Sequence, residues 1–116
     1  MKFKLILAFS ESSHCDELLD AARDAGAMGA TIISHARGEG MKKTRGIFGL
    51  EITAQRDVLL FLVEEHRARR VLETIARVGE FDDTPGTGIV IQLDVEDALG
   101  VRHQIEELSE SIQEEI

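Results

Sequence analysis

The sequence predicts an α+β fold, in which helices pack against one antiparallel sheet within a single domain over residues 1–116. Segments with an apolar residue at every second position, typical of half-buried strands, alternate with segments whose apolar residues recur at helical spacing. A chain of 116 residues is also long enough for one hydrophobic core and too short for two. Since 43% of the residues are hydrophobic and none is Trp or Tyr, that core must be mostly aliphatic.

The first part of the chain predicts a strand, a helix and a second strand. The first strand covers residues 2–9, and its alternation places four apolar residues on one face: Phe3, Leu5, Leu7 and Phe9. Ser12 and Ser13 are suited to cap the helix that follows, because a hydroxyl oxygen accepts a hydrogen bond from the first N–H groups of a helix. Helical spacing continues to Gly26, and residues 30–35 form the second strand.

The second part predicts a long loop, two more strands and a second helix. Residues 38–49 hold four glycines and three basic residues and are expected to form a loop or hairpin tip. Residues 50–63 follow as a long strand, and the continuous apolar run over 58–63 predicts that both of its faces are covered. Residues 68–78 form the second helix and residues 89–95 the fourth strand. The order β-α-β-β-α-β is that of the ferredoxin-like fold.

An acidic helix is expected over residues 101–116. Its apolar residues recur on one face: Val101, Ile105, Leu108, Ile112 and Ile116. Burying three of them would stabilise the helix by about 1.5–3 kcal/mol each, enough for it to dock on its own sheet or on a neighbouring subunit.

Two glycine-rich loops, at residues 31–40 and 84–88, adjoin apolar strands and are candidates for one binding site. Glycine permits a positive φ and lets an anionic ligand approach bare N–H groups. The same glycines could merely shape turns. Neither a Ser-His-Asp set nor a carboxylate pair can be argued, so the loops predict a small-molecule sensor and not an enzyme.

The bulk properties exclude several other classes. A net charge of −9 argues against a nucleic-acid partner, because neutralising phosphates needs a basic face. The single cysteine, Cys15, excludes an internal disulfide and fits a reducing compartment. No segment approaches the about 18 apolar residues of a membrane span, so a cytoplasmic location is expected.

The glycine loops and their flanking strands resemble the PII signalling family. Residues 27–32 with 37–40 carry the first part of the resemblance, and residues 86–95 carry the more specific second part. The family consists of trimeric ferredoxin-like proteins that bind adenine nucleotides in clefts between subunits. The resemblance therefore implies a homotrimer and an ATP, ADP or AMP ligand.

The resemblance also implies which residues bind the nucleotide. These residues are Thr31, Gly38, Gly40, Arg56, Gly86, Thr87, Gly88 and Arg102. Gly86, Thr87 and Gly88 would hold phosphates through their backbone N–H groups. Arg56 stands where the family places a lysine, and Arg102 matches one of two arginines that approach phosphate.

Residues 41–54 correspond to the long loop with which family members contact a protein target, such as a membrane transporter or an enzyme. The residues expected to form that contact are Lys42, Lys43, Arg45, Ile47 and Phe48. The chain departs from the family at four points. Lys42 stands where the family has a glutamine used for magnesium and 2-oxoglutarate, and Ile89 replaces a lysine after the last loop glycine. Gly100 replaces the second arginine, and no tyrosine is present for uridylylation.

Two other functions remain open from the sequence. A metal-handling trimer of the divalent-cation-tolerance type shares the fold and would need Cys15 and histidines to cluster. A ligand-free oligomerisation module would instead exchange the acidic helix between subunits. Arg67, Arg69 and Arg70 are expected to form only the solvated face of the second helix.

Overall fold

A computed structural model describes residues 2–36 and 55–103 of the chain. Its elements, in chain order, are β1 (Phe3–Glu11), the 3-10 helix η1 (Ser12–His14), α1 (Cys15–Ala25), β2 (Thr31–Ala36), β3 (Arg56–Glu64), α2 (Glu65–Val78) and β4 (Gly88–Asp94). Arg102 and His103 are also helical, at the start of the expected acidic helix. The rest of that helix, residues 104–116, and the expected partner loop, residues 41–54, lie outside the described residues.

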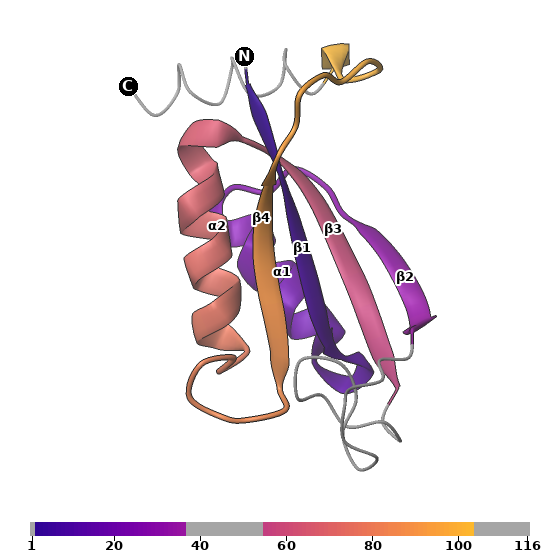
Figure 1. Cartoon of the computed structure of the whole chain (residues 1–116), viewed down its shortest axis with the longest axis vertical. Helices are drawn as coiled ribbons and strands as arrows, with labels where there is room; N and C mark the ends of the chain where they lie inside the picture. The colour runs from indigo at the N-terminus through magenta and orange to yellow at the C-terminus, as the bar shows by residue number, and fades with distance from the viewer. Residues whose placement is uncertain (1, 37–54, 104–116) are drawn as a thin grey trace.

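The four strands form one antiparallel sheet in the order β2-β3-β1-β4. Both helices lie on the same side of this sheet (Figure 1). The predicted β-α-β-β-α-β order and the ferredoxin-like fold are therefore confirmed.

The core lies between the sheet and the two helices. Its largest members from the sheet are Ile6, Leu59, Phe61 and Val63, and those from the helices are Leu18, Val71 and Ile75. Each such side chain stabilises the fold by about 1.5–3 kcal/mol relative to its exposed state. The core is mostly aliphatic, as the composition predicts.

The predicted alternation of β1 is confirmed, but its apolar set does not lie on the face that the helices cover. Ile6, Ala8 and Ser10 are buried toward the helices, whereas Leu5, Leu7 and Phe9 point to the opposite face and are only half-buried. Phe3 is buried, at the start of the strand. The physical reason is that both faces of β1 carry apolar residues, so alternation alone does not tell which face the helices cover.

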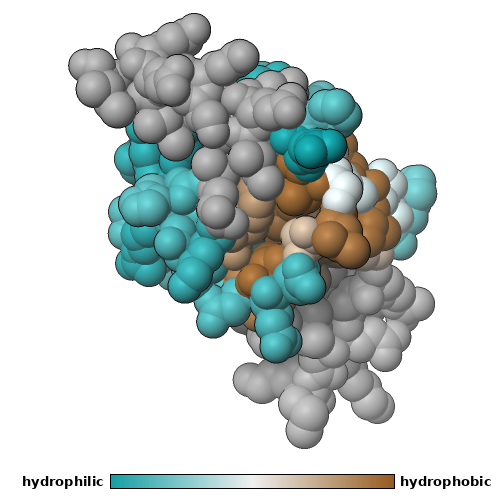
Figure 2. Space-filling view, turned by 90° about the horizontal axis from the view of Figure 1, so that it is seen from above, coloured by the Kyte–Doolittle hydropathy of each residue, from teal (hydrophilic) through white to brown (hydrophobic). Residues whose placement is uncertain are grey.

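No described helix covers the second face of the sheet, which we call the open face. Register and alternation place ten apolar residues on it: Leu5, Leu7, Phe9, Ile33, Val58, Leu60, Leu62, Ile89, Ile91 and Leu93. Figure 2 shows hydrophobic residues gathered in one region of the surface, beside hydrophilic ones. The prediction that β3 is covered on both faces is therefore not met by the described part of one protomer.

The start of α1 differs from the prediction, whereas its end agrees with it. Ser12 does not cap α1, because its hydroxyl donates to Asp57 Oδ1 at 2.9 Å and η1 intervenes. The N-cap of α2 is Glu64, a buried carboxylate that accepts from the backbone N–H of His66 at 2.9 Å. The same carboxylate lies 2.6 Å from His66 Nδ1 and raises the pKa of that imidazole. Gly26, with φ of 123°, ends α1 as predicted.

Candidate functional site

The candidate site lies at one end of the sheet, where β1 and β2 end and β3 and β4 begin (Figure 1). We call it the Arg56 end. The register places Glu11 and Ala36 opposite Arg56 and places Gly88 opposite Ser10. The turn before β4, the start of β3 and the end of β2 are thus brought to the same end of the protein. Gly38 and Gly40 follow the end of β2 in sequence but lie outside the described residues.

The turn over residues 84–88 is stabilised by hydrogen bonds from the Thr87 hydroxyl to backbone carbonyl oxygens. Thr87 Oγ1 donates to the carbonyl oxygens of Thr84, at 2.8 Å, and Glu80, at 3.1 Å. Gly86 has φ of 80°, a conformation that favours glycine. Within the described residues, the backbone N–H groups of Gly86 and Thr87 donate no hydrogen bond. This leaves two backbone donors for an anion.

Arg56 is the most unusual charged residue of the structure. It begins β3 and is only 2% exposed, although a buried cation is costly unless it is paired and hydrogen-bonded. Its Nη1 lies 3.3 Å from Oε1 of Glu11, across the β1–β3 pair. In the described part of the protein, none of its guanidinium nitrogens makes a hydrogen bond. The geometry therefore leaves a buried cation with unused donors.

Arg102 and Thr31 are not brought to this site within one protomer. β4 leads away from Gly88 for seven residues, about 20 Å at 3.3 Å per residue, and Arg102 follows its far end. Thr31 lies beside Leu60, in the middle of β3. In addition, β2 and β4 are at opposite edges, about 14 Å apart at 4.8 Å per strand. The predicted set can therefore meet one ligand only if a second copy contributes.

The sequence did not single out Glu11. Its position beside Arg56 follows from the register of β1 with β3, two segments far apart in the chain. Neither residue lies in a local motif that would indicate the pairing. A carboxylate at the end of a predicted strand is the only signal that the sequence offers.

A metal site is not supported by the described residues, among which no group of three or more His, Cys, Asp or Glu residues could hold an ion. Burial, followed by a hydrogen bond with Asp57, raises the pKa of the Cys15 thiol to about 11. The thiol is therefore protonated at neutral pH and is a poor ligand or nucleophile.

We expect Cys15 to resist alkylation by iodoacetamide at pH 7.5 in the folded protein and to react fully in 8 M urea, because it is 7% exposed and protonated. Mass spectrometry of the modified protein would measure this. Rapid modification without denaturant would contradict the assignment of Cys15 to the core.

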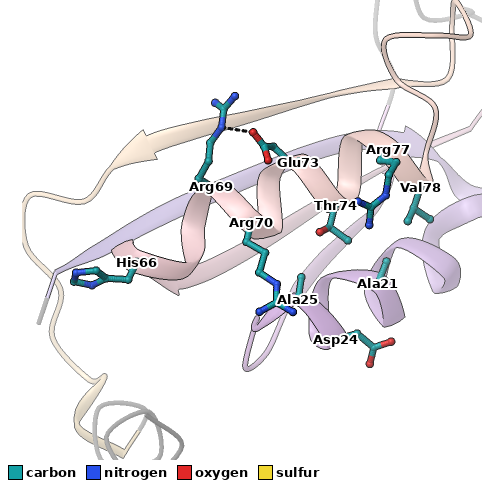
Figure 3. A pocket seen from close by; sticks show the side chains of 10 residues that line it. All are labelled: Ala21, Asp24, Ala25, His66, Arg69, Arg70, Glu73, Thr74, Arg77 and Val78. Carbon is teal, nitrogen blue, oxygen red and sulfur yellow. Dashed lines mark hydrogen bonds and ion pairs between the residues drawn. The ribbon is translucent and has the colours of Figure 1, made fainter. Parts of the chain in front are cut away.

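A groove lies between α1 and α2 (Figure 3). It has a volume of about 800 Å³ and is lined by three arginines, Arg69, Arg70 and Arg77, which are exposed. Arg69 pairs with Glu73 at 2.7 Å, one helical turn away. This arrangement fits a solvated helix face, as expected for Arg69 and Arg70.

No described helix is long and apolar enough to cross a membrane.

The fold defines the chain as a ferredoxin-like α+β protein, and the comparison with protein families makes this assignment specific. The family of nitrogen regulatory protein P-II matches residues 3–105. The chain therefore belongs to the P-II family, a family of regulatory proteins, and the resemblance noted in the sequence is confirmed. No curated protein matches the chain.

Solved structures give the same fold. CPII from Thiomonas intermedia K12, bound to ADP, AMP and acetate, has a TM-score of 0.66 at 20% identity, over 87% of this chain and 93% of that one. CPII bound to ADP, AMP and bicarbonate has a TM-score of 0.62 at 20% identity, over 88% and 97%. A PII-like signalling protein from Thermus thermophilus has a TM-score of 0.60 at 27% identity, over 82% and 88%.

Proposed function

We propose that this protein is a PII-like regulator that forms a homotrimer, binds an adenine nucleotide between subunits and signals to a partner protein. The observation that carries the proposal is the Arg56 end. There, a buried guanidinium and a glycine turn, whose N–H groups make no hydrogen bond within the described residues, lie at the same end of the sheet. Both are suited to phosphate oxygens.

The adenine nucleotide is supported by what similar proteins bind. CPII is bound to ADP and AMP in the structures compared above. In this chain the phosphates would lie against Gly86, Thr87, Gly88 and Arg56. Gly38 and Gly40 would complete the contact from the loop after β2. The absence of a lysine at Ile89 and of an arginine at Gly100 would weaken the affinity by about ten- to a hundredfold each, since a hydrogen bond to a charged group contributes about 1.5–3 kcal/mol.

The trimer is supported by the open face and by the separation of Arg102 and Thr31 from the Arg56 end within one protomer. Ten apolar residues share one sheet face that no described helix covers, and Ile33, Ile91 and Leu93 among them are exposed, as is typical of an interaction surface. A second copy packed against this face would also bring its own Arg102 or Thr31 toward the Arg56 end of the first. The same contact would explain why apolar residues run continuously over 58–63.

Signalling is supported by where the partner loop is attached. Residues 41–54 connect the end of β2 to the start of β3, and both of these points lie at the Arg56 end. A nucleotide bound there would contact the base of the loop and could order it, as phosphate contacts order switch segments in other proteins. Lys42, Lys43, Arg45, Ile47 and Phe48 would then meet the target, a transporter or an enzyme facing the cytoplasm.

Arg56→Ala is expected to weaken nucleotide binding by at least tenfold, because a charge-assisted hydrogen bond contributes about 1.5–3 kcal/mol. Isothermal titration calorimetry of the wild type with ATP, ADP and AMP gives the reference affinity. Arg77→Ala, an exposed arginine of the α1–α2 groove, is the matched control and should bind as the wild type does. Equal affinity of the two variants would show that Arg56 does not bind the nucleotide. The absence of heat with all three nucleotides would exclude an adenine nucleotide as the ligand.

A further inference from the structure

Arg56 and Glu11 form an ion pair of unequal exposure. Arg56 is 2% exposed, whereas the Glu11 side chain is 34% exposed, so Glu11 is the member of the pair that reaches solvent. The distance of 3.3 Å from Nη1 to Oε1 is within ion-pair range, but no nitrogen of Arg56 makes a hydrogen bond in the described residues. The carboxylate thus neutralises Arg56 without using its directional donors.

An anion that enters from solvent must compete with this carboxylate. Guanidinium has five N–H donors in a planar fork, which suits two oxygens of a phosphate or carboxylate group at once. Because Glu11 is partly exposed to solvent and makes a single 3.3 Å contact with Arg56, a better-aligned anion can replace it. The other acidic neighbour in sequence, Asp57, points to the helix-covered face and accepts from Ser12 at 2.9 Å.

We propose that Glu11 is a tethered competitor of the ligand: its carboxylate occupies Arg56 while the site is empty and is displaced by the anionic group of the effector. This inference rests on the proposed function and adds how the site is regulated. Glu11 lowers the affinity for the anion and keeps Arg56 neutralised in the free protein. The ligand group is an oxyanion, either the phosphate of the nucleotide or a small carboxylate such as acetate.

The direct test uses Glu11→Gln, which keeps the size of the side chain and removes its charge. We expect Glu11→Gln to bind inorganic phosphate about fivefold more tightly than the wild type, the effect of removing about 1 kcal/mol of competing ion pair. A thermal-shift titration with phosphate at constant ionic strength measures this. Glu73→Gln, which removes the same charge from the exposed pair with Arg69, is the matched control and should not change the phosphate response.

Nucleotide titrations identify which oxyanion displaces Glu11. If a nucleotide phosphate does so, Glu11→Gln tightens the binding of ADP or AMP. If a small carboxylate does so, only the binding of acetate in the presence of ADP is tightened. The effect should vanish on an Arg56→Ala background, because without the guanidinium there is nothing to compete for.

Two outcomes overturn the inference, and they differ from failure of the proposed function. Unchanged phosphate and nucleotide affinities in Glu11→Gln show that Glu11 does not compete. Weaker binding shows that Glu11 positions Arg56 instead. If neither protein binds any nucleotide while phosphate still stabilises Glu11→Gln more than the wild type, then the nucleotide is wrong and the competition is right.

Discussion

Gly88→Ala is expected to destabilise the fold by about 3 kcal/mol, at the upper end of what overpacking costs. A Cβ at this position would lie 2.4 Å from the carbonyl oxygen of Phe9 and 2.6 Å from the ring of Phe81. The Phe9 oxygen belongs to the backbone of β1, which pairs with β4 and cannot move aside without breaking that pairing. Urea denaturation followed by circular dichroism measures the loss in free energy of unfolding.

Gly29→Ala is the matched control, because a Cβ there meets no atom within 4 Å. We expect its free energy of unfolding to stay within about 0.5 kcal/mol of the wild type, as for other surface substitutions. Wild-type stability of Gly88→Ala would mean that the turn before β4 is looser than the contact with Phe9 requires. The same variant should also lose nucleotide affinity, since Gly88 closes the turn that presents the N–H groups of Gly86 and Thr87.

The order of the elements could be predicted because its signals are local. Apolar alternation identified each strand, helical spacing identified each helix, and Gly26 marked the end of α1. These patterns depend on residues within one or two turns of each other. The boundaries were predicted less well: β3 begins at Arg56 in the described residues, and α2 begins at Glu65 rather than three residues later.

The sequence could not show which face of the sheet the helices cover. The alternation in β1, β3 and β4 is real, but its regular apolar set lies on the open face, not on the face that the helices cover. Both faces carry enough apolar residues to be buried, and in the described residues only one of them is covered, by α1 and α2. Alternation is equally regular on either face, so it does not tell which one the helices cover.

The site could be predicted only as far as its parts resemble a known family. Arg56 and the turn over 84–88 are at one end of the sheet, in agreement with a shared ligand. The pairing of Glu11 with Arg56, in contrast, is a property of strand register, which depends on the whole sheet. The separation of Arg102 from the Arg56 end also cannot be predicted from the sequence alone.

The open face has the strongest consequence for assembly. Leu7 lies at its centre, on the inner strand β1, with Leu60 on one side and Ile91 on the other. If three copies bury this face, each Leu7 contributes about 1.5–3 kcal/mol of apolar burial to the trimer. A charge at the same position would be buried without a partner, which costs more than the apolar contact provides.

Leu7→Glu is therefore expected to convert a trimer into monomers, because the loss is repeated in each of three subunits and exceeds about 5 kcal/mol in total. Light scattering after size-exclusion chromatography measures the mass, and circular dichroism shows whether the protomer stays folded. Leu99→Glu is the matched control: Leu99 is 94% exposed, follows β4 in sequence and is not among the ten residues of the open face, so this variant should keep the wild-type mass. A folded Leu7→Glu protein with the mass of a trimer would show that the subunits meet through another surface, and the site split between Arg56 and Arg102 would then need a different explanation.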